Sequence, residues 1–439
     1  MRAVASRKPP PAVEVPSTAL RWLTPVIAAG ALLVPLVMSM SGEEVFRYPK
    51  ELFLRLEVVV VAVLLLSLAL LGRLDLPRIS LRQKWVAITV LICGWTVLTA
   101  LVSTNRFVSI PPTVRVLEYA LLFVVTVLIV RDRALPFAGL LVAPAIVNAV
   151  IYLLQELDVW SPFDVSTAVE KHLGRTALLG NPNDVGSYLV APALVATALS
   201  MTHRRYRLLW AAAAVLLIVA TFATQTVGAI GALIAALFVM FALWRRSWGW
   251  TLAALVSIVV LTGIAFTAYK PLHDRAALMR DAFEKRDYEI LSASRTLPTL
   301  AGLEMARDHP LFGVGPGCFA YEFFDYKLRV QQQHRWLYGS HVTQYNFGEA
   351  HNDHLQVLSE TGLVGYALFA TAIVLLAAGS RRPRQTAEGS GRAELVRLLS
   401  LPVAASLAVL AIAQFPLELV APTSAYLWTA AVLCAWRES

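Results

Sequence analysis

The chain has 439 residues, of which 57% are hydrophobic and only 15% are charged. Soluble globular domains carry about 25% charged residues, so this composition excludes an ordinary soluble enzyme and indicates an integral membrane protein. The net charge of +9 does not indicate nucleic-acid binding, because the arginines fall in short clusters between apolar runs rather than along one polar face. Three isolated cysteines provide no basis for a disulfide framework.

Apolar runs of about twenty residues, the length that crosses a bilayer as a helix, recur along the chain. They predict twelve membrane spans, at residues 20–40, 54–72, 85–103, 113–130, 135–155, 186–202, 208–225, 228–244, 250–269, 362–379, 398–415 and 423–436. The first run is too long for the apolar part of a signal peptide. The sequence therefore predicts an all-α polytopic membrane protein with about twelve transmembrane helices.

Every second loop between these spans is rich in arginine. The basic clusters are Arg73/Arg78/Arg82/Lys84, Arg131/Arg133, Arg204/Arg205/Arg207, Arg245/Arg246 and Arg381/Arg382/Arg384/Arg392/Arg397. By the positive-inside rule, these loops and both chain termini face the cytoplasm. The intervening loops then lie on the outer side of the membrane.

One polar segment of about eighty residues, 270–352, interrupts the series of spans, and we call it the insert. It divides the chain into an N-terminal membrane domain (1–269, about nine spans), the insert itself, and a C-terminal membrane segment (353–439, about three spans). Span parity places the insert on the outer side. Apolar spacing predicts an amphipathic helix at 273–290 lying on the membrane surface, a second helix at 295–308 and a turn at 313–317.

Arginine and histidine side chains that could carry chemistry gather at this outer face. A glycan linked to a lipid diphosphate brings a leaving group that departs as a weakly basic anion. Arginine stabilises such an anion with a permanent charge and paired hydrogen bonds. The acceptor hydroxyl benefits from a base whose pKa lies near neutrality, which is the range of histidine. Arginine and histidine together suffice for this transfer, with no metal ion and no cofactor.

Each candidate also has a plainer interpretation. An interfacial arginine commonly anchors a helix at the lipid headgroups, and a lone interfacial histidine commonly caps a helix. His351 and His354 stand three residues apart, but no H-E-x-x-H pattern or neighbouring cysteine supports metal binding. Gly313 and Gly315 resemble a phosphate-binding loop only faintly and are expected to be turn residues.

Three motifs together resemble those of the O-antigen ligase and polymerase superfamily, bacterial multispan glycosyltransferases that use undecaprenyl-diphosphate-linked glycans. They are GRTALLGNPNDVGSYL at 174–189, SRTLPTLAGLEMARDHPLFGVGPGCF at 294–319 and AHNDHLQVLSETGLVGYALF at 350–369. The resemblance implies an inverting, metal-independent glycosyltransferase in the bacterial inner membrane, with both termini cytoplasmic and a periplasmic active site. Its partners would be the lipid-linked donor, an acceptor hydroxyl and the bilayer, with no nucleic acid.

The resemblance also implies roles for individual residues. The histidine of the family's loop falls on His351, which would deprotonate the acceptor hydroxyl. The loop arginine ahead of PLFGVG falls on Arg295, and the arginine before the Asn-Pro-Asn segment falls on Arg175; both would hold the diphosphate. Secondary candidates are Asn352, Asp353, His354, Glu360 and Asn183.

One position departs from the family pattern. Many members carry Ser-Arg-Gly-Ala in an outer turn between two spans, whereas this chain reads Thr-Val-Gly-Ala at 226–229, so that Val227 stands at the arginine position. The sequence leaves open whether Arg175 compensates for the missing charge or the activity is weakened.

The sequence also leaves the acceptor open. Transfer to lipid A core, as by an O-antigen ligase, is the leading prediction. A second lipid-linked glycan as acceptor would make the protein a polysaccharide (O-antigen) polymerase, and a serine or threonine would make it a protein O-oligosaccharyltransferase. A polytopic transporter is the alternative from another class, but the ionisable residues gather at one surface rather than near the membrane midplane, which favours an interfacial enzyme.

Overall fold

The computed structural model describes residues 20–40, 44–74, 80–130, 134–162, 174–245, 249, 270–292, 294–337, 346–381 and 390–438, and the regular elements within them are all helices. The α-helices are α1 (Leu20–Leu33), α2 (Arg47–Leu70), α3 (Lys84–Leu101), α4 (Arg106–Val130), α5 (Ala134–Glu156), α6 (Pro182–Thr202), α7 (Arg207–Ala223), α8 (Val227–Arg245), α10 (Lys270–Lys285), α11 (Tyr288–Leu291), α12 (Thr296–Asp308), α13 (Cys318–Gln333), α14 (Asp353–Ala377), α15 (Ser390–Ala413) and α16 (Val420–Glu438). The predicted all-α class is confirmed.

Nine helices in the described part of the chain are long and apolar enough to cross a membrane. They are α2 to α8, α14 and α15, and all nine coincide with predicted spans. The first predicted span extends too far, since α1 ends at Leu33 shortly before Pro35. The last, α16, lies inside the bundle against α4, α6 and α15 and is less apolar than the other spans. The predicted span 250–269 lies outside the described residues.

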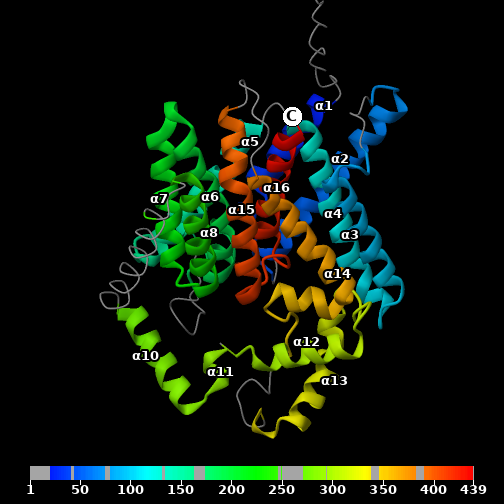
Figure 1. Ribbon diagram of the computed structural model, residues 1–439, viewed down its shortest axis with the longest axis vertical. Coiled ribbons are helices and arrows are strands. Elements are labelled where there is room, and N and C mark those ends of the chain that lie inside the picture. Colours follow the sequence, from blue (N-terminus) through cyan, green and yellow to red (C-terminus); the bar gives the residue numbers. More distant parts are fainter. Residues whose placement is uncertain are drawn as a thin grey trace, which may run out of the picture.

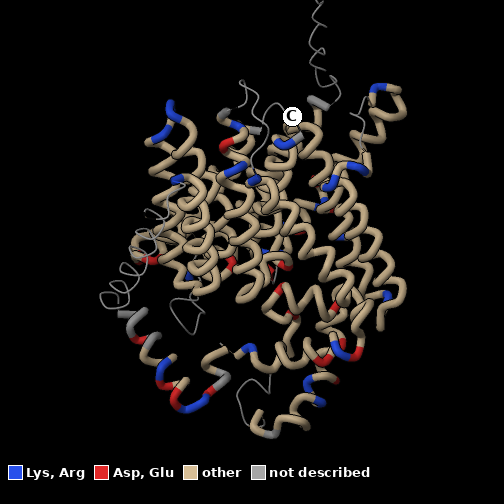
Figure 2. Tube along the Cα trace, viewed as in Figure 1, with Lys and Arg blue, Asp and Glu red and all other residues tan. Residues whose placement is uncertain are grey.

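The long helices form one bundle, and the helices of the insert lie across one end of it (Figure 1). Lysine and arginine residues gather at the opposite end of the bundle, whereas the insert carries charges of both signs (Figure 2). The helices alternate in direction, so the start of α2, the turn between α7 and α8 and the end of α15 all face the insert.

Helix α6 is the centre of the bundle and packs against α5, α7, α8, α15 and α16. Small residues allow this close packing, which is how helices associate in membranes where water exclusion gives no driving force. A Cβ atom added at Gly186 would lie 2.8 Å from Thr224 Oγ1. At its first turn, the Asn181 side chain accepts a hydrogen bond from Asp184 N at 2.9 Å, and Pro182 takes the first helical position. The Asn-Pro-Asn motif is therefore a helix start.

The insert has a small core of its own beneath the bundle. Phe319 and Phe323 of α13 pack with Leu297 and Met305 of α12 and with Leu355 of α14. The helix predicted at 295–308 is confirmed as α12. The one predicted at 273–290 is confirmed only as far as Lys285, where α10 ends, because Arg286 adopts a left-handed φ of 54° before the short α11. Helix α13 was not predicted. Its N-terminal contacts tie it to α14: Glu360 accepts hydrogen bonds from Gly317 N at 2.8 Å and Phe319 N at 3.3 Å.

Helix α14 begins at Asp353, nine residues before the predicted start of its span, because Asn352 caps it by accepting from Leu355 N at 3.0 Å. Gly362 interrupts the helix with a φ of 70°, and its missing side chain admits the loop after α12: a Cβ there would lie 2.1 Å from the Leu311 carbonyl oxygen. Reciprocally, a Cβ at Gly313 would lie 2.2 Å from the Glu360 carbonyl carbon. These glycines interlock the insert with α14, which holds residues 346–353 in place.

Candidate functional site

His351 lies where the insert meets the bundle, directly before the capping residue of α14. Its backbone adopts a left-handed conformation with a φ of 54°, which turns the ring away from the helix axis. The ring packs edge-on against Phe415, at a centroid distance of 4.6 Å, and against Phe347 at 5.8 Å. This histidine is therefore held between the insert and the segment that joins α15 to α16.

The hydrogen bond of the His351 ring defines its basic nitrogen. Nδ1 lies 3.0 Å from the Glu349 carbonyl oxygen, which can only accept, so Nδ1 carries the proton. In the neutral ring, Nε2 then has a free lone pair. The pKa of His351 is lowered, mainly by burial and further by the positive charges of Arg295 and Arg47. The imidazole is thus neutral near pH 7 and able to accept a proton.

Arg295 stands at the N-terminal cap position of α12, on the bundle side of the insert. Its Nη1 donates a hydrogen bond to the Ala413 carbonyl oxygen, two residues before Phe415. This contact orients the guanidinium group at the end of α15. Arg295 therefore lies near enough to His351 for its charge to lower the pKa of the ring.

Arg47, the first residue of α2, joins the same cluster although the sequence analysis did not select it. Its guanidinium carbon lies 5.8 Å from the centre of the Phe415 ring, and its Nη2 lies 3.4 Å from Asp184 Oδ2. Its side chain remains 44% exposed. One signal was present in the sequence: Arg47 and Lys50 are basic residues in a loop that the positive-inside rule places outside. We call His351, Arg295, Arg47 and Phe415 the His351 cluster.

Arg175 makes a different contact. Its Nη1 pairs with Glu156 at the end of α5, and both side chains are only 16% exposed. The loop around it is tied down by internal hydrogen bonds: Gln155 Oε1 accepts from Ala177 N at 2.8 Å, and Asn148 Oδ1 accepts from Leu178 N at 3.1 Å. The structure does not bring Arg175 into the His351 cluster by any described contact.

The secondary candidates make contacts that position the backbone. Asn352 caps α14, and Asp353 Oδ2 accepts from Leu417 N at 2.9 Å, which fixes the segment that carries Phe415. His354 Nε2 donates to the Ala408 carbonyl oxygen at 2.9 Å and so joins α14 to α15. Glu360 binds the start of α13, as described above. These residues therefore fix the backbone segments that carry His351 and Phe415.

The turn that carries Val227 lies next to the cluster. A Cβ at Gly228 would lie 3.0 Å from both Ala413 Cβ and Gln414 Cγ, and Ala413 is the residue that accepts from Arg295. Thr226 Oγ1 donates to Asn183 Oδ1 at 3.2 Å, which places the last secondary candidate beside this turn. The Val227 side chain is 62% exposed, so the position can hold a longer residue.

No group of three histidine, cysteine, aspartate or glutamate side chains with the arrangement of a metal site occurs among the described residues. The chemistry that the His351 cluster offers is one neutral imidazole and two guanidinium groups around an aromatic ring. Such a set can accept a proton and stabilise an anion at neighbouring points.

Comparison with known proteins bears on this geometry. Residues 212–370 match the family model described as O-antigen ligase, and the match includes α10 to α13, Arg295 and His351. No curated protein matches the chain.

Proposed function

We propose that this chain, whose residues 212–370 match the family model described as O-antigen ligase, is a membrane glycosyltransferase that moves a glycan from undecaprenyl diphosphate to an acceptor hydroxyl of lipid A core. The observation that carries the proposal is the His351 cluster: a histidine whose Nδ1 faces a backbone carbonyl, beside Arg295 and Arg47. The insert supplies the base and one arginine. The membrane segments on either side supply Arg47 and Phe415.

His351 acts as the general base. As the acceptor oxygen attacks the anomeric carbon, Nε2 takes the hydroxyl proton and Nδ1–H keeps its bond to the Glu349 carbonyl. The same carbonyl favours the imidazolium that forms, since hydrogen bonding to the charged form stabilises it. Phe415 and Phe347 fix the ring plane through the edge-on contacts, so the lone pair keeps one direction through the reaction.

Arg295 and Arg47 hold the departing diphosphate. As the bond between the sugar and the phosphate oxygen breaks, its electron pair stays with the diphosphate, and the growing negative charge strengthens its interaction with both guanidinium groups. Arg47 occupies the role that the sequence analysis assigned to Arg175. Arg175 contributes indirectly, by keeping the loop that leads to Asn181 and Asp184 in place.

We infer a single displacement with inversion at the anomeric carbon. Three carboxyl groups near the cluster are engaged or buried. Asp184 pairs with Arg47, and Asp353 accepts from Leu417 N. Burial, the largest cause, raises the pKa of the Glu349 side chain. A retaining mechanism would require a carboxylate nucleophile facing a second carboxyl group across the sugar.

The distribution of charge supports a periplasmic position for the cluster. The end of the bundle that is rich in lysine and arginine lies opposite the insert (Figure 2), and basic loops face the cytoplasm. We propose accordingly that the protein resides in the bacterial inner membrane with both termini cytoplasmic, and that the three segments 1–269, 270–352 and 353–439 are its functional divisions.

The decisive experiment supplies the purified protein with a defined undecaprenyl-diphosphate oligosaccharide and separates the products by mass. Three acceptors are offered in parallel: lipid A core, a second lipid-linked glycan and a serine-containing peptide. A product on lipid A core supports the ligase proposal. Transfer only to glycan or peptide would reassign the protein as a polymerase or a protein O-oligosaccharyltransferase, and solute uptake by vesicles with no donor consumed would favour a transporter.

A further inference from the structure

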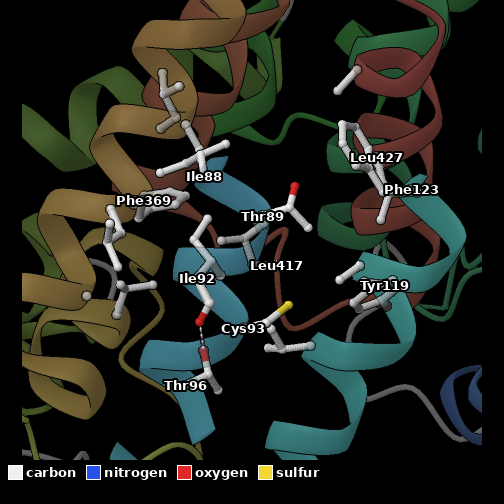
Figure 3. A pocket seen from close by; sticks show the side chains of 18 of the residues that line it. Ile88, Thr89, Ile92, Cys93, Thr96, Tyr119, Phe123, Phe369, Leu417 and Leu427 are labelled. Atoms are coloured by element: carbon white, nitrogen blue, oxygen red, sulfur yellow. Dashed lines mark hydrogen bonds between the residues drawn. The ribbon is translucent and has the colours of Figure 1, made fainter. Parts of the chain in front are cut away.

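A second feature lies apart from the His351 cluster: a cavity of about 730 Å³ between α3, α4, α14 and α16. Helix α14 packs on α3, and α16 packs on α4. The cavity lies between these two pairs of helices. Figure 3 shows the middle of the cavity, where side chains of α3 such as Ile88, Ile92 and Cys93 face Phe123 of α4, Phe369 of α14 and Leu427 of α16. The wall at this depth is almost entirely apolar.

The two ends of the cavity differ in charge. At the end near the insert, its lining includes three carboxylates, Asp353, Glu360 and Glu418, and one arginine, Arg115, which pairs with Glu418 at 2.6 Å. At the opposite end the described lining is basic: Arg82 and Lys84 at the start of α3 and Arg437 at the end of α16. An anionic group is therefore favoured at the basic end.

We propose that the cavity holds one anionic phospholipid from the leaflet opposite the insert. Its phosphate headgroup contacts Arg82, Lys84 and Arg437, and an acyl chain extends along α3 toward Thr96. Thr96 lies twelve residues after Lys84, a distance of about 18 Å along the axis of α3. This is close to half the thickness of a hydrocarbon core of about 30 Å. Basic pockets between membrane helices on the cytoplasmic side bind anionic headgroups in this way.

The site proposed for the lipid-linked donor lies outside this cavity. Residues 415–418 separate the two sites, because Phe415 contacts His351 whereas Leu417 and Glu418 line the cavity. A bound phospholipid would therefore contact Leu417, in the segment that carries Phe415.

Native mass spectrometry of the purified protein, incubated with equal amounts of phosphatidylglycerol and phosphatidylcholine, tests the proposal. We expect one phosphatidylglycerol to be retained in preference. The triple variant Arg82→Gln/Lys84→Gln/Arg437→Gln should lose about tenfold or more of this preference. The matched control Arg204→Gln/Arg205→Gln/Arg207→Gln removes an equal charge from the 3₁₀ turn Arg204–Tyr206 and the first residue of α7, and should keep the preference.

A second pair of variants locates the acyl chain. Ala372 lines the cavity, so Ala372→Trp should reduce retention of both phospholipids, whereas Thr371→Trp, one residue away on the exposed face of α14, should not. The proposal is overturned if the triple variant keeps its preference, if Ala372→Trp binds lipid like the wild type, or if inorganic phosphate alone competes with the lipid. Preferred retention of a polyprenyl phosphate would overturn it as well. None of these outcomes depends on glycan transfer.

Discussion

Two regions at the insert end of the bundle carry arginines in motifs of similar appearance, yet their surroundings differ. In the His351 cluster, Arg295 donates to a backbone carbonyl and Arg47 lies over an aromatic ring. In the loop 174–181, Arg175 faces a carboxylate of its own protein, Glu156, and neighbouring backbone groups are bound by buried side chains. Arg47 also pairs with a carboxylate, Asp184 at 3.4 Å, but its side chain stays 44% exposed, whereas both side chains of the Arg175–Glu156 pair are only 16% exposed. We infer that burial of the ion pair, rather than the pair alone, makes a motif arginine structural.

Substitution of His351 should have the largest effect on this comparison. His351→Ala removes the proton acceptor, and we expect transfer to fall by about 10²- to 10⁴-fold. The unfolding temperature should change little, because the ring contributes only two edge contacts and one hydrogen bond to a carbonyl two residues away. His354→Ala is the matched control: it breaks the Ala408 contact and should reduce stability more than the rate of the chemical step. Near-normal turnover of His351→Ala would remove the base from the mechanism.

Arg295 comes next in expected effect. Arg295→Ala should lower kcat by about 10²- to 10³-fold, as for the loss of one donor to a developing anion. Arg295→Lys should recover only part of this loss, because an ammonium group cannot make the paired contact of a guanidinium. Turnover is measured with saturating acceptor and varied donor. Equal rates for the wild type and both variants would make Arg295 a membrane anchor.

Variants of Arg47 and Arg175 compare the two regions most directly. Arg47→Gln should lower kcat/KM for the donor by about tenfold or more, since a charge-assisted contact is lost. Arg175→Gln should leave the rate within about twofold and lower the free energy of unfolding by about 1–3 kcal/mol, because it leaves the Glu156 carboxylate without its partner. The double variant Arg175→Gln/Glu156→Gln should regain stability. If instead Arg175→Gln lost as much activity as Arg47→Gln, the assignment of the loop as structural would be wrong.

Substitution of Val227, in the turn beside the cluster, should produce a smaller effect, a gain in affinity for the donor. Val227→Arg restores a cation near Ala413 and Gln414 at an exposed position, and should lower the KM for the lipid-linked donor a few-fold. Val227→Gln is the control for side-chain length and should leave the KM unchanged. A KM lowered equally by both substitutions would show that charge is not the cause.

The sequence predicted most of the fold because a membrane helix is encoded locally, by length and apolar composition. The same local signals missed α13, whose apolar residues are diluted by charged ones and whose packing depends on Glu360, over forty residues further along. They also placed the start of α14 at Gly362, because the polar turn before it does not look like a membrane span although Asn352 caps it.

For the candidate site, motif position selected His351 and Arg295 but not Arg47. Arg47 lies 248 residues before Arg295 in the sequence, and Phe415 lies 64 residues after His351. Arg47 contacts the Phe415 ring, whereas Arg295 contacts the backbone of Ala413, two residues earlier. Only the tertiary packing of α2 against the segment joining α15 to α16 brings them together. Conversely, the Asn-Pro-Asn motif drew attention to a helix start whose neighbouring arginine is already paired.

The pH dependence of transfer separates the two regions, because Arg47 acts on the pKa of His351 and Arg175 does not. His351 must be neutral to accept a proton, so activity falls as the pH drops below its pKa, which burial and then Arg295 and Arg47 hold below the usual value. Removing a positive neighbour favours the imidazolium and raises this pKa. Arg47→Gln should therefore move the acidic limb of kcat/KM to higher pH, by less than about one unit.

Arg175→Gln provides the control for this measurement, because it removes the same charge from the loop 174–181, whose arginine does not contribute to the pKa of His351. Its acidic limb should coincide with that of the wild type between about pH 5 and about pH 8. Equal shifts in the two variants would mean that the charge acts through the overall field of the protein. A shift in Arg47→Gln alone places that guanidinium next to the catalytic base.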